Sequence, residues 1–237
     1  MKETRFFYVP DAASESFLPE EESSHALRVL RMQAGDEMFL MDGAGTYYKA
    51  VVTGTTRHEC GYEITAVMPQ KPQWAGHLHI AMAPTKMMDR TEWMLEKVTE
   101  VGVNEISLLN CMNSERRVVK AERLERILVS AMKQSRKPWK PVLNGMTPFG
   151  QFVSKPLAGR KFIAHCHPEI PRAYLFDELG KAGAADATVL IGPEGDFSME
   201  EVREAVGLGF VSVHLGESRL RTETAAVVAS VMMHLAG

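Results

Sequence analysis

The chain has no long apolar run and only three cysteines among its 237 residues. No stretch approaches the roughly 20 apolar residues that span a bilayer, and the N-terminal segment "MKETRFFYVPDAASE" lacks the apolar core of a signal peptide. We therefore expect a cytoplasmic protein that is not attached to a membrane. Cys60, Cys111 and Cys166 are widely spaced and form no CxxC pair, so the sequence predicts neither a disulfide framework nor a metal site.

An overall excess of positive charge is also missing, since the formal net charge is -3. This argues against a generally basic surface for nucleic acid. The segment 111–141 differs, because it holds nine Lys or Arg residues against three Glu residues. Such a local excess is typical of a surface that meets a phosphate backbone, and it is equally typical of a solvated helix face.

The pattern of apolar residues divides the chain into two parts, 1–73 and 74–237. Short strand-like segments fill the first part, and "SSHALRVLRM" adds one helix for which Ser23 or Ser24 is the expected N-cap. This predicts a small antiparallel β domain. After the linker-like "PQKPQW", strands and helices alternate, which predicts an α/β domain with a mainly parallel sheet.

Three expected strands of the α/β domain end in loops that lie in the last third of the chain. These strands end near Ala164, Ile191 and Leu215. Ligands of open parallel sheets bind beyond the carboxyl ends of the strands, because the loops there expose backbone donors and acceptors on a rigid support. We therefore expect a site formed by these loops.

The loop "IGPEGDFSMEE" follows the second of these strands. Gly192 and Gly195 leave the backbone bare, Pro193 stiffens it, and Ser198 with Glu201 has the spacing of a capping box. Two interpretations stay open: a turn that needs glycine for steric reasons, or a loop whose backbone approaches a ligand. The chain has no GKS/T and no GxGxxG motif, so a nucleotide-phosphate site is only weakly indicated.

The loop "LGESRLRTETAA" follows the third strand. It places Gly216, Arg219, Arg221 and Glu223 between an apolar strand and an apolar helix, which favours a functional site. The helix "TAAVVASVMMHLA" is small and apolar on nearly every face, which suggests an additional contact with a second subunit.

Together these two loop motifs resemble the SPOUT class of methyltransferases, and specifically the small-subunit (16S) ribosomal RNA (uracil-N3)-methyltransferases. The segments "HALRVLRM", "KMMDRTEWMLEKVTEVGV" and "SERRVVKAERLERILVSAMKQS" extend the resemblance over almost the whole chain. It implies a C-terminal α/β-knot domain, tied in a trefoil knot, and a small N-terminal PUA-like β-barrel that binds RNA. It also implies a homodimer that binds S-adenosyl-L-methionine in the knot and acts on ribosomal RNA or the small ribosomal subunit.

By position, the resemblance implies which residues form the cofactor pocket. They are Ala164, His165, Ile191, Gly192, Pro193, Glu194, Gly195, Leu215, Gly216, Leu220 and Arg221. Methylation of uracil N3 requires loss of its proton, and a cation stabilises the negative charge that develops on the ring oxygens. Arg221 or Arg219 is the expected cation. Glu194 is the expected proton acceptor or base-orienting group, unless its carboxylate only binds loop amides.

The resemblance also places RNA contacts in two segments. The expected RNA-binding residues are His25, Arg28, Arg31, Arg116, Arg117 and Arg123. In the helix between these segments, Asp89 and Arg90 are expected to be structural, and Trp93 with Met94 is expected in the core.

The chain departs from the family's pattern at two positions. Asp196 stands where the family usually has glycine, and we expect it to tolerate an unusual turn geometry. Lys133 stands where the family often has glutamate. Two alternatives to uracil methylation stay open: a SPOUT ribose 2'-O-methyltransferase, and a non-catalytic RNA-binding factor of ribosome assembly.

Overall fold

The computed structural model describes residues 5–72, 74–181 and 186–236. Contacts divide the chain into two compact units, one of residues 1–73 with 129–140 and one of residues 74–128 with 141–237. Helix α3 (Ala121–Ser135) therefore contributes its first half to the second unit and its last turns to the first. The predicted boundary after residue 73 assigns all of this helix to the C-terminal domain.

The first unit is built on a four-stranded sheet. Its strands are β1 (Phe6–Tyr8), β2 (Glu37–Met41), β3 (Thr46–Thr55) and β4 (Cys60–Pro69), in the order β1-β2-β3-β4. β2, β3 and β4 pair antiparallel as predicted, whereas β1 pairs parallel to β2. The strands place Phe7, Leu40 and Ala50 in one fully buried core.

The helix predicted in the first unit forms, but it begins earlier than expected. Its elements are α1 (Glu20–Ser24) and a π-helical turn, η1 (His25–Val29). The N-cap is Pro19, so the prediction of Ser23 or Ser24 was wrong. Ser23 is buried, where its Oγ donates to the carbonyl of Leu18 at 2.9 Å and accepts from the amide of Cys60 at 3.3 Å. Tertiary hydrogen bonds therefore use the hydroxyl that would otherwise cap a helix.

The second unit is an α/β domain on a seven-stranded sheet whose pairs are all parallel, as predicted. The strands are β5 (Leu78–Met82), β6 (Glu105–Asn110), β7 (Val142–Pro148), β8 (Arg160–Ala164), β9 (Ala173–Tyr174), β10 (Ala187–Ile191) and β11 (Val211–His214). Their order is β7-β6-β5-β10-β8-β11-β9. β10, β8 and β11 are consecutive in the sheet, so the loops that follow them leave from one edge.

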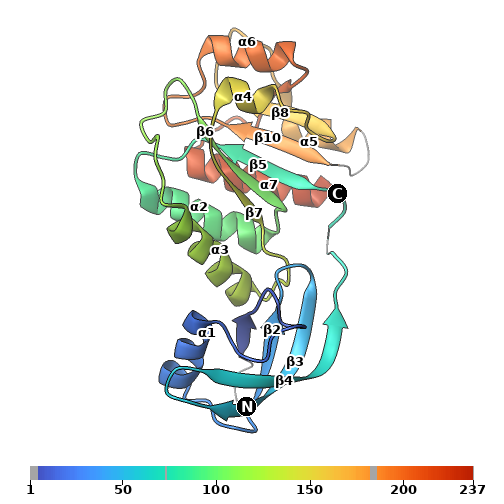
Figure 1. Cartoon of the computed structure of the whole chain (residues 1–237). Coiled ribbons are helices and arrows are strands. Elements are labelled where there is room, and N and C mark those ends of the chain that lie inside the picture. The colour runs from blue at the N-terminus through green and yellow to red at the C-terminus, as the bar shows by residue number, and fades with distance from the viewer. Residues whose placement is uncertain (1–4, 73, 182–185, 237) are drawn as a thin grey trace. The chain divides into compact units, whose positions relative to one another are not determined.

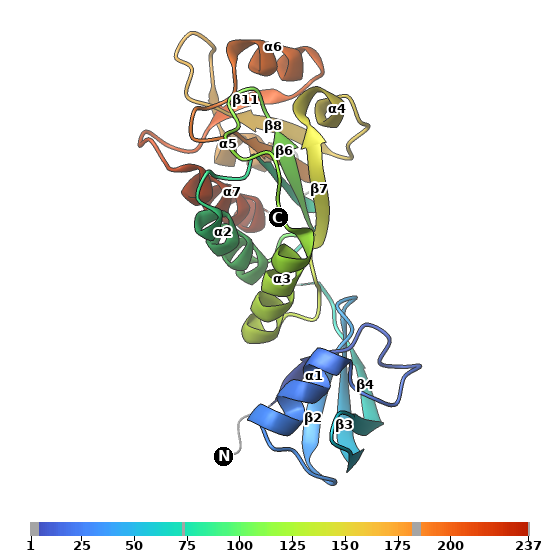
Figure 2. The same cartoon turned by 60° about the vertical axis from the view of Figure 1, so that its left-hand side comes forward.

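Helices cover both faces of this sheet (Figure 1). Besides α3 they are α2 (Met88–Val101), α4 (Phe149–Val153), α5 (Leu175–Gly180), α6 (Met199–Gly207) and α7 (Thr222–Ala236). α2, α5 and α7 pack over one face around Ile80, Met94 and Ala229. α4 and α6 pack over the other, around Ile163 and Leu190 (Figure 2). None of the helices in the described ranges has both the length and the apolar character needed to span a bilayer.

The helix ends test several expectations. Gly102 and Gly207 follow helical patterns in the sequence and are the expected C-caps. Gly102 ends α2 in the left-handed conformation with a φ of 117°, as expected. At α6 the expected end is wrong, because Gly207 is helical and the left-handed glycine is Gly209, with a φ of 88°. The capping box is confirmed: Ser198 Oγ accepts from the Glu201 amide at 3.1 Å, and the Glu201 carboxylate accepts from the Ser198 amide at 2.8 Å.

Candidate functional site

A cavity of about 1070 Å³ lies beyond the carboxyl ends of β8, β10 and β11. Residues 164–172, 191–196 and 214–223 line it, together with Arg90 and Ala225. Three loops that are distant in sequence meet here because parallel neighbouring strands end at the same edge of the sheet. The three loops that the sequence predicts to share a site thus line one common cavity.

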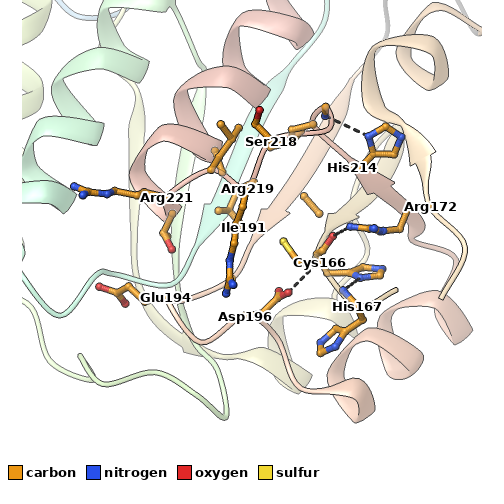
Figure 3. Close-up of a pocket in the computed structure, with 18 of the residues that line it drawn as sticks. Cys166, His167, Arg172, Ile191, Glu194, Asp196, His214, Ser218, Arg219 and Arg221 are labelled. Carbon is orange, nitrogen blue, oxygen red and sulfur yellow. Dashed lines mark hydrogen bonds between the residues drawn. The ribbon is translucent and has the colours of Figure 1, made fainter. Parts of the chain in front are cut away.

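Every residue predicted for the cofactor pocket lines this cavity. They are Ala164, His165, Ile191, Gly192, Pro193, Glu194, Gly195, Leu215, Gly216, Leu220 and Arg221. Arg219, the other expected cation, lines it as well. The two motif loops therefore line the same cavity (Figure 3).

The loop between β10 and α6 is attached to several other segments through its carboxylates. Glu194 Oε1 accepts from the amide of Lys86 at 2.9 Å. The Glu201 carboxylate, besides closing the capping box, accepts from the amide of Met112 at 2.8 Å. Asn113 Nδ2 donates to the carbonyl of Asp196 at 3.1 Å. The loop is thus held rigidly, and Glu194 has the amide-binding arrangement that was the alternative to a catalytic role.

The glycines of the two motif loops are required for different reasons. A Cβ on Gly192 would lie 2.9 Å from the backbone nitrogen of Phe197, so the steric interpretation applies to this glycine. A Cβ on Gly195 would lie 3.3 Å from Asn113 Cβ. Gly216 has a φ of 125° and nothing within 4 Å of its Cβ position, so it needs glycine for its backbone conformation and leaves open space beside it.

Asp196 joins two walls of the cavity. Its backbone has a φ of 65°, which confirms the expectation that aspartate tolerates an unusual turn here. One carboxylate oxygen accepts from the amide of Cys166 at 2.7 Å, and the other accepts from the amide of Phe197 at 2.8 Å. The β10–α6 loop is therefore bound to the loop after β8 by the side chain that replaces the family's usual glycine.

Three histidines line the cavity, and their hydrogen bonds indicate their tautomers. His165 Nδ1 accepts from the amide of His167, so its proton is on Nε2, which faces Ser212 Oγ. Burial lowers the pKa of His165 to about 4, which keeps the ring neutral. His167 Nε2 lies 2.7 Å from the carbonyl of Phe197, to which it donates. Within the described ranges, no group of three or more His, Cys, Asp or Glu side chains is placed to bind a metal ion.

The arginines of the cavity differ in their partners. Arg172 donates to the carbonyl of His165 at 2.8 Å, and Arg90 lies 3.8 Å from Glu223. The side chains of Arg219 and Arg221 are exposed and make no hydrogen bond or ion pair within the described part of the chain. In Figure 3, Arg219 points toward the Glu194–Asp196 side of the cavity, whereas Arg221 points away from it.

The predicted RNA-binding residues belong to both units. In the first, Arg28 and Arg31 are exposed, and Arg31 has left the helix with a φ of 51°. His25 is half-buried and meets the Phe7 ring edge-on at 6.2 Å. In the second unit the three arginines have protein partners: Arg116 donates to the carbonyl of Lys86, Arg117 to that of Met112, and Arg123 binds Glu92.

One residue of the helical segments, Trp93, differs from expectation in its surroundings. Trp93, expected in the core, is 44% exposed, whereas its neighbour Met94 is buried as predicted. The apolar stripe of α2 passes through Met94, Leu95 and Val98, which leaves Trp93 on its outer edge. Lys133 binds the buried Glu22 at 2.6 Å within the first unit.

Sequence analysis missed several residues of the cavity. Among them are Arg90, Cys166, His167, Arg172, His214, Glu217 and Ser218. Most follow directly after β8 or β11, so counting further along each loop would have found them. Arg90 lies on α2, and no sequence signal links that helix to the cavity.

The cavity combines apolar side chains, open backbone and two guanidinium groups without a partner among the described residues. Its volume of about 1070 Å³ slightly exceeds the range of about 300–1,000 Å³ that is typical of ligand sites. These arginines can stabilise negative charge that develops on a bound ligand.

Two family models match the chain. The RNA methyltransferase domain matches residues 72–234, and the RNA methyltransferase PUA domain matches residues 18–60. Among curated proteins, the ribosomal RNA small subunit methyltransferase E of Mycobacterium bovis is 29% identical over 238 residues. That match covers 94% of this chain and 88% of the relative.

Solved structures agree with these matches. A probable rRNA-methyltransferase from Porphyromonas gingivalis has a TM-score of 0.90 and 44% identity, over 98% of this chain and 97% of the other. A ribosomal RNA small subunit methyltransferase E from Neisseria gonorrhoeae, bound to S-adenosyl methionine, has a TM-score of 0.84 and 25% identity, over 98% of each chain. These likenesses confirm the predicted fold class, a C-terminal α/β-knot domain with a small N-terminal PUA-like domain.

Proposed function

Because the chain belongs to the RNA methyltransferase family whose domain model matches residues 72–234, we propose that it methylates N3 of a uridine in 16S ribosomal RNA, with S-adenosyl-L-methionine as methyl donor. The Mycobacterium bovis relative is named as a methyltransferase of small-subunit ribosomal RNA, which supports the choice of RNA. The choice of uracil N3 rests on the resemblance of the two loop motifs.

The observation that carries this proposal is the common cavity of those two loops. Gly192–Gly195 and Leu215–Arg221 lie on separate segments of the sequence, yet both line a single cavity at the strand ends. A site for a bent nucleoside needs apolar walls and accessible backbone groups at such an edge. If either loop faced elsewhere, the two motifs could not contribute to one binding site.

The residues present fit S-adenosyl-L-methionine. Ile191, Leu215 and Leu220 would hold its apolar parts, and the open backbone beside Gly216 would accept a close approach. The cofactor supplies an activated methyl group, so the protein has to supply position and charge stabilisation.

The arginines of the β11–α7 loop would stabilise the acceptor. When N3 of uracil loses its proton, negative charge spreads onto the ring oxygens, and a desolvated cation beside them lowers the barrier. Arg219 and Arg221 are the candidates, and Arg219 is better placed because it points toward the opposite loop (Figure 3). We assign Glu194 to orienting the β10–α6 loop, since its carboxylate accepts a hydrogen bond from the Lys86 amide.

RNA would be bound by basic side chains of both units. Arg28 and Arg31 are exposed and available to phosphates. Arg117 and Arg123 are exposed as well, although Arg123 would have to share its guanidinium with Glu92. These contacts predict an affinity that falls steeply with salt.

We also propose that the protein is a homodimer. α7 is a mainly apolar helix, and its side chains Val231 and Leu235 are 37% and 68% exposed. An apolar helix face open to water favours association with another copy.

The decisive experiment maps modified nucleosides of ribosomal RNA by mass spectrometry, with and without the gene. Deletion should abolish one N3-methyluridine, and the restored protein should return it. Loss of a ribose 2'-O-methyl group instead would identify the rival methyltransferase. Calorimetry with S-adenosyl-L-methionine separates an enzyme from a non-catalytic assembly factor, which should not bind the cofactor.

A further inference from the structure

Glu223 has an unusual combination of burial and missing partners. It lies in the first turn of α7, is 7% exposed, and lines the cavity. Its Oε2 is buried, and none of the residues that the structure describes donates a hydrogen bond to it. Its Oε1 is 3.8 Å from Nη1 of Arg90, which is an ion-pair distance and longer than a hydrogen bond.

A buried carboxylate oxygen without a donor is unfavourable for folding alone. Native proteins pair the large majority of their buried polar atoms, and leaving one unpaired costs about 1–3 kcal/mol or more for a charged group. A buried carboxylate oxygen without a donor among the described residues, on a residue that lines a ligand cavity, indicates that a donor arrives with the ligand.

The other carboxylates of the cavity are already bound or open to water. Glu194 and Asp196 accept from backbone amides, at 2.9 Å from Lys86 and 2.7 Å from Cys166. Glu169 and Glu217 are exposed, so water solvates their oxygens. Among the described residues that line the cavity, Glu223 is therefore the carboxylate with a desolvated oxygen left free.

The histidines offer one competing proton acceptor. His165 and His214 each accept a backbone N–H on Nδ1, so the proton of the neutral ring is on Nε2 and no ring lone pair is left for a substrate. His167 donates from Nε2 to the carbonyl of Phe197, which leaves the lone pair on its Nδ1. His167 is thus the rival that an experiment has to separate from Glu223.

We propose that Glu223 is the catalytic base that removes the N3 proton of the target uridine. This rests on the proposed function. The N3–H bond breaks and its proton goes to Oε2 of Glu223, while the electron pair left on N3 forms the new bond to the methyl carbon. The donor's carbon–sulfur bond breaks, and the sulfur keeps that electron pair, so the donor leaves as the uncharged thioether.

The groups around Glu223 suit this step. Before transfer, the carboxylate lies in the first turn of α7, and its Oε1 is 3.8 Å from the guanidinium of Arg90. During transfer its charge passes to the uracil ring beside Arg219, which makes no ion pair within the described residues. Negative charge therefore moves between two cationic surroundings and is stabilised in both positions.

The test compares Glu223→Gln with the wild-type protein on ribosomal RNA that lacks the modification. Glutamine keeps the size of the side chain and cannot take the proton. Single-turnover methyl transfer should fall by about 10²- to 10⁴-fold, the range typical of a lost general base. The dissociation constant for S-adenosyl-L-methionine, measured by calorimetry, and the RNA affinity should change less than about twofold, because the glutamine amide oxygen can still accept the hydrogen bond of the uridine N3–H.

The pH dependence provides a readout that a structural role would not move. Without a base, only uracil that has already lost its N3 proton can react, so the residual rate of Glu223→Gln should rise about tenfold per pH unit near neutrality. The wild-type rate should stay nearly flat there. Glu96→Gln is the matched control, because Glu96 lies on the surface of α2 and binds Lys97.

Three results would overturn the inference. They are an unchanged transfer rate in Glu223→Gln, a loss of cofactor binding or of thermal stability that accounts for the rate, and a comparable rate loss with the pH slope in His167→Gln alone. A failure of the proposed function looks different, because the wild-type protein itself would then form no N3-methyluridine.

Discussion

The two motif loops of the cavity differ in how they are held. In the β10–α6 loop and the first turn of α6, the side chains of Glu194, Asp196 and Glu201 all bind backbone amides of other segments or of the loop itself. In the β11–α7 loop, Glu217, Ser218 and Arg219 are exposed and make no such bonds within the described residues. One loop therefore uses its charged groups to build the cavity, and the other leaves them available to ligands.

The first loop shows how preorganisation is achieved without rigid secondary structure. Its carboxylates each satisfy amides that would otherwise need water, and together they tie α6, the β5–α2 loop and the β8 loop to one another. The second loop is held mainly by the elements at its ends. The difference predicts that substitutions in the first loop change stability and substitutions in the second change activity.

Among substitutions in the two loops, the largest effect is expected for the arginines of the β11–α7 loop. Arg219→Ala should slow methyl transfer by about 10²- to 10³-fold, because it removes a cation from beside the developing uracil anion. Arg221→Ala should also slow transfer, and by less, since its guanidinium points away from the cavity in Figure 3. Cofactor binding should stay largely intact in both. An unchanged turnover of a variant in single-turnover assays would remove that arginine from the mechanism.

The next effect concerns the attached loop. Gly192→Ala places a Cβ 2.9 Å from the backbone nitrogen of Phe197, so the loop must shift. Overpacking of this kind costs about 1–3 kcal/mol of unfolding free energy, measured by denaturant titration. Because the shift also deforms the cavity wall, the cofactor should bind more weakly. Full stability together with full affinity would contradict the steric role of this glycine.

Asp196→Asn should have a smaller effect on stability, of about 0.5–1.5 kcal/mol, because an amide group has only one oxygen to accept the two bonds. Hydrogen exchange of the Cys166 amide should accelerate. Ser218→Ala in the other loop is the control, and its stability should stay within about 0.5 kcal/mol. Equal exchange rates in Asp196→Asn and the wild-type protein would show that this carboxylate does not hold the wall.

A further expected effect is a pH dependence of stability. The unfolded chain protonates His165 near pH 6.5, whereas the folded protein does so only near a pKa of about 4. Protons therefore bind the unfolded state first, and this contribution to stability is lost as the pH falls from 6.5 toward 4. His165→Gln should make the unfolding free energy less sensitive to pH in that window. Parallel profiles for the two proteins would contradict the buried, neutral state of this ring.

The cavity was predictable to the extent that it follows from strand order. The expected strand ends near Ala164, Ile191 and Leu215 meet because neighbouring parallel strands finish at one edge. The capping box of Ser198 and Glu201 was visible as a local spacing. Trp93 was wrongly predicted in the core, because helical periodicity alone assigns a residue to a helix face only to within one position. In the structure the buried residue is its neighbour Met94.

The sequence by itself determined the alternation of strands and helices, the two motif loops, and the positions at which these loops need glycine. These depend on local periodicity and on φ angles, which neighbouring residues set. Only the tertiary structure decided which carboxylates bind amides and which one is left free. The amides of Lys86, Met112 and Cys166 reach the β10–α6 loop through sheet packing. No comparable donor in the described chain reaches Oε2 of Glu223.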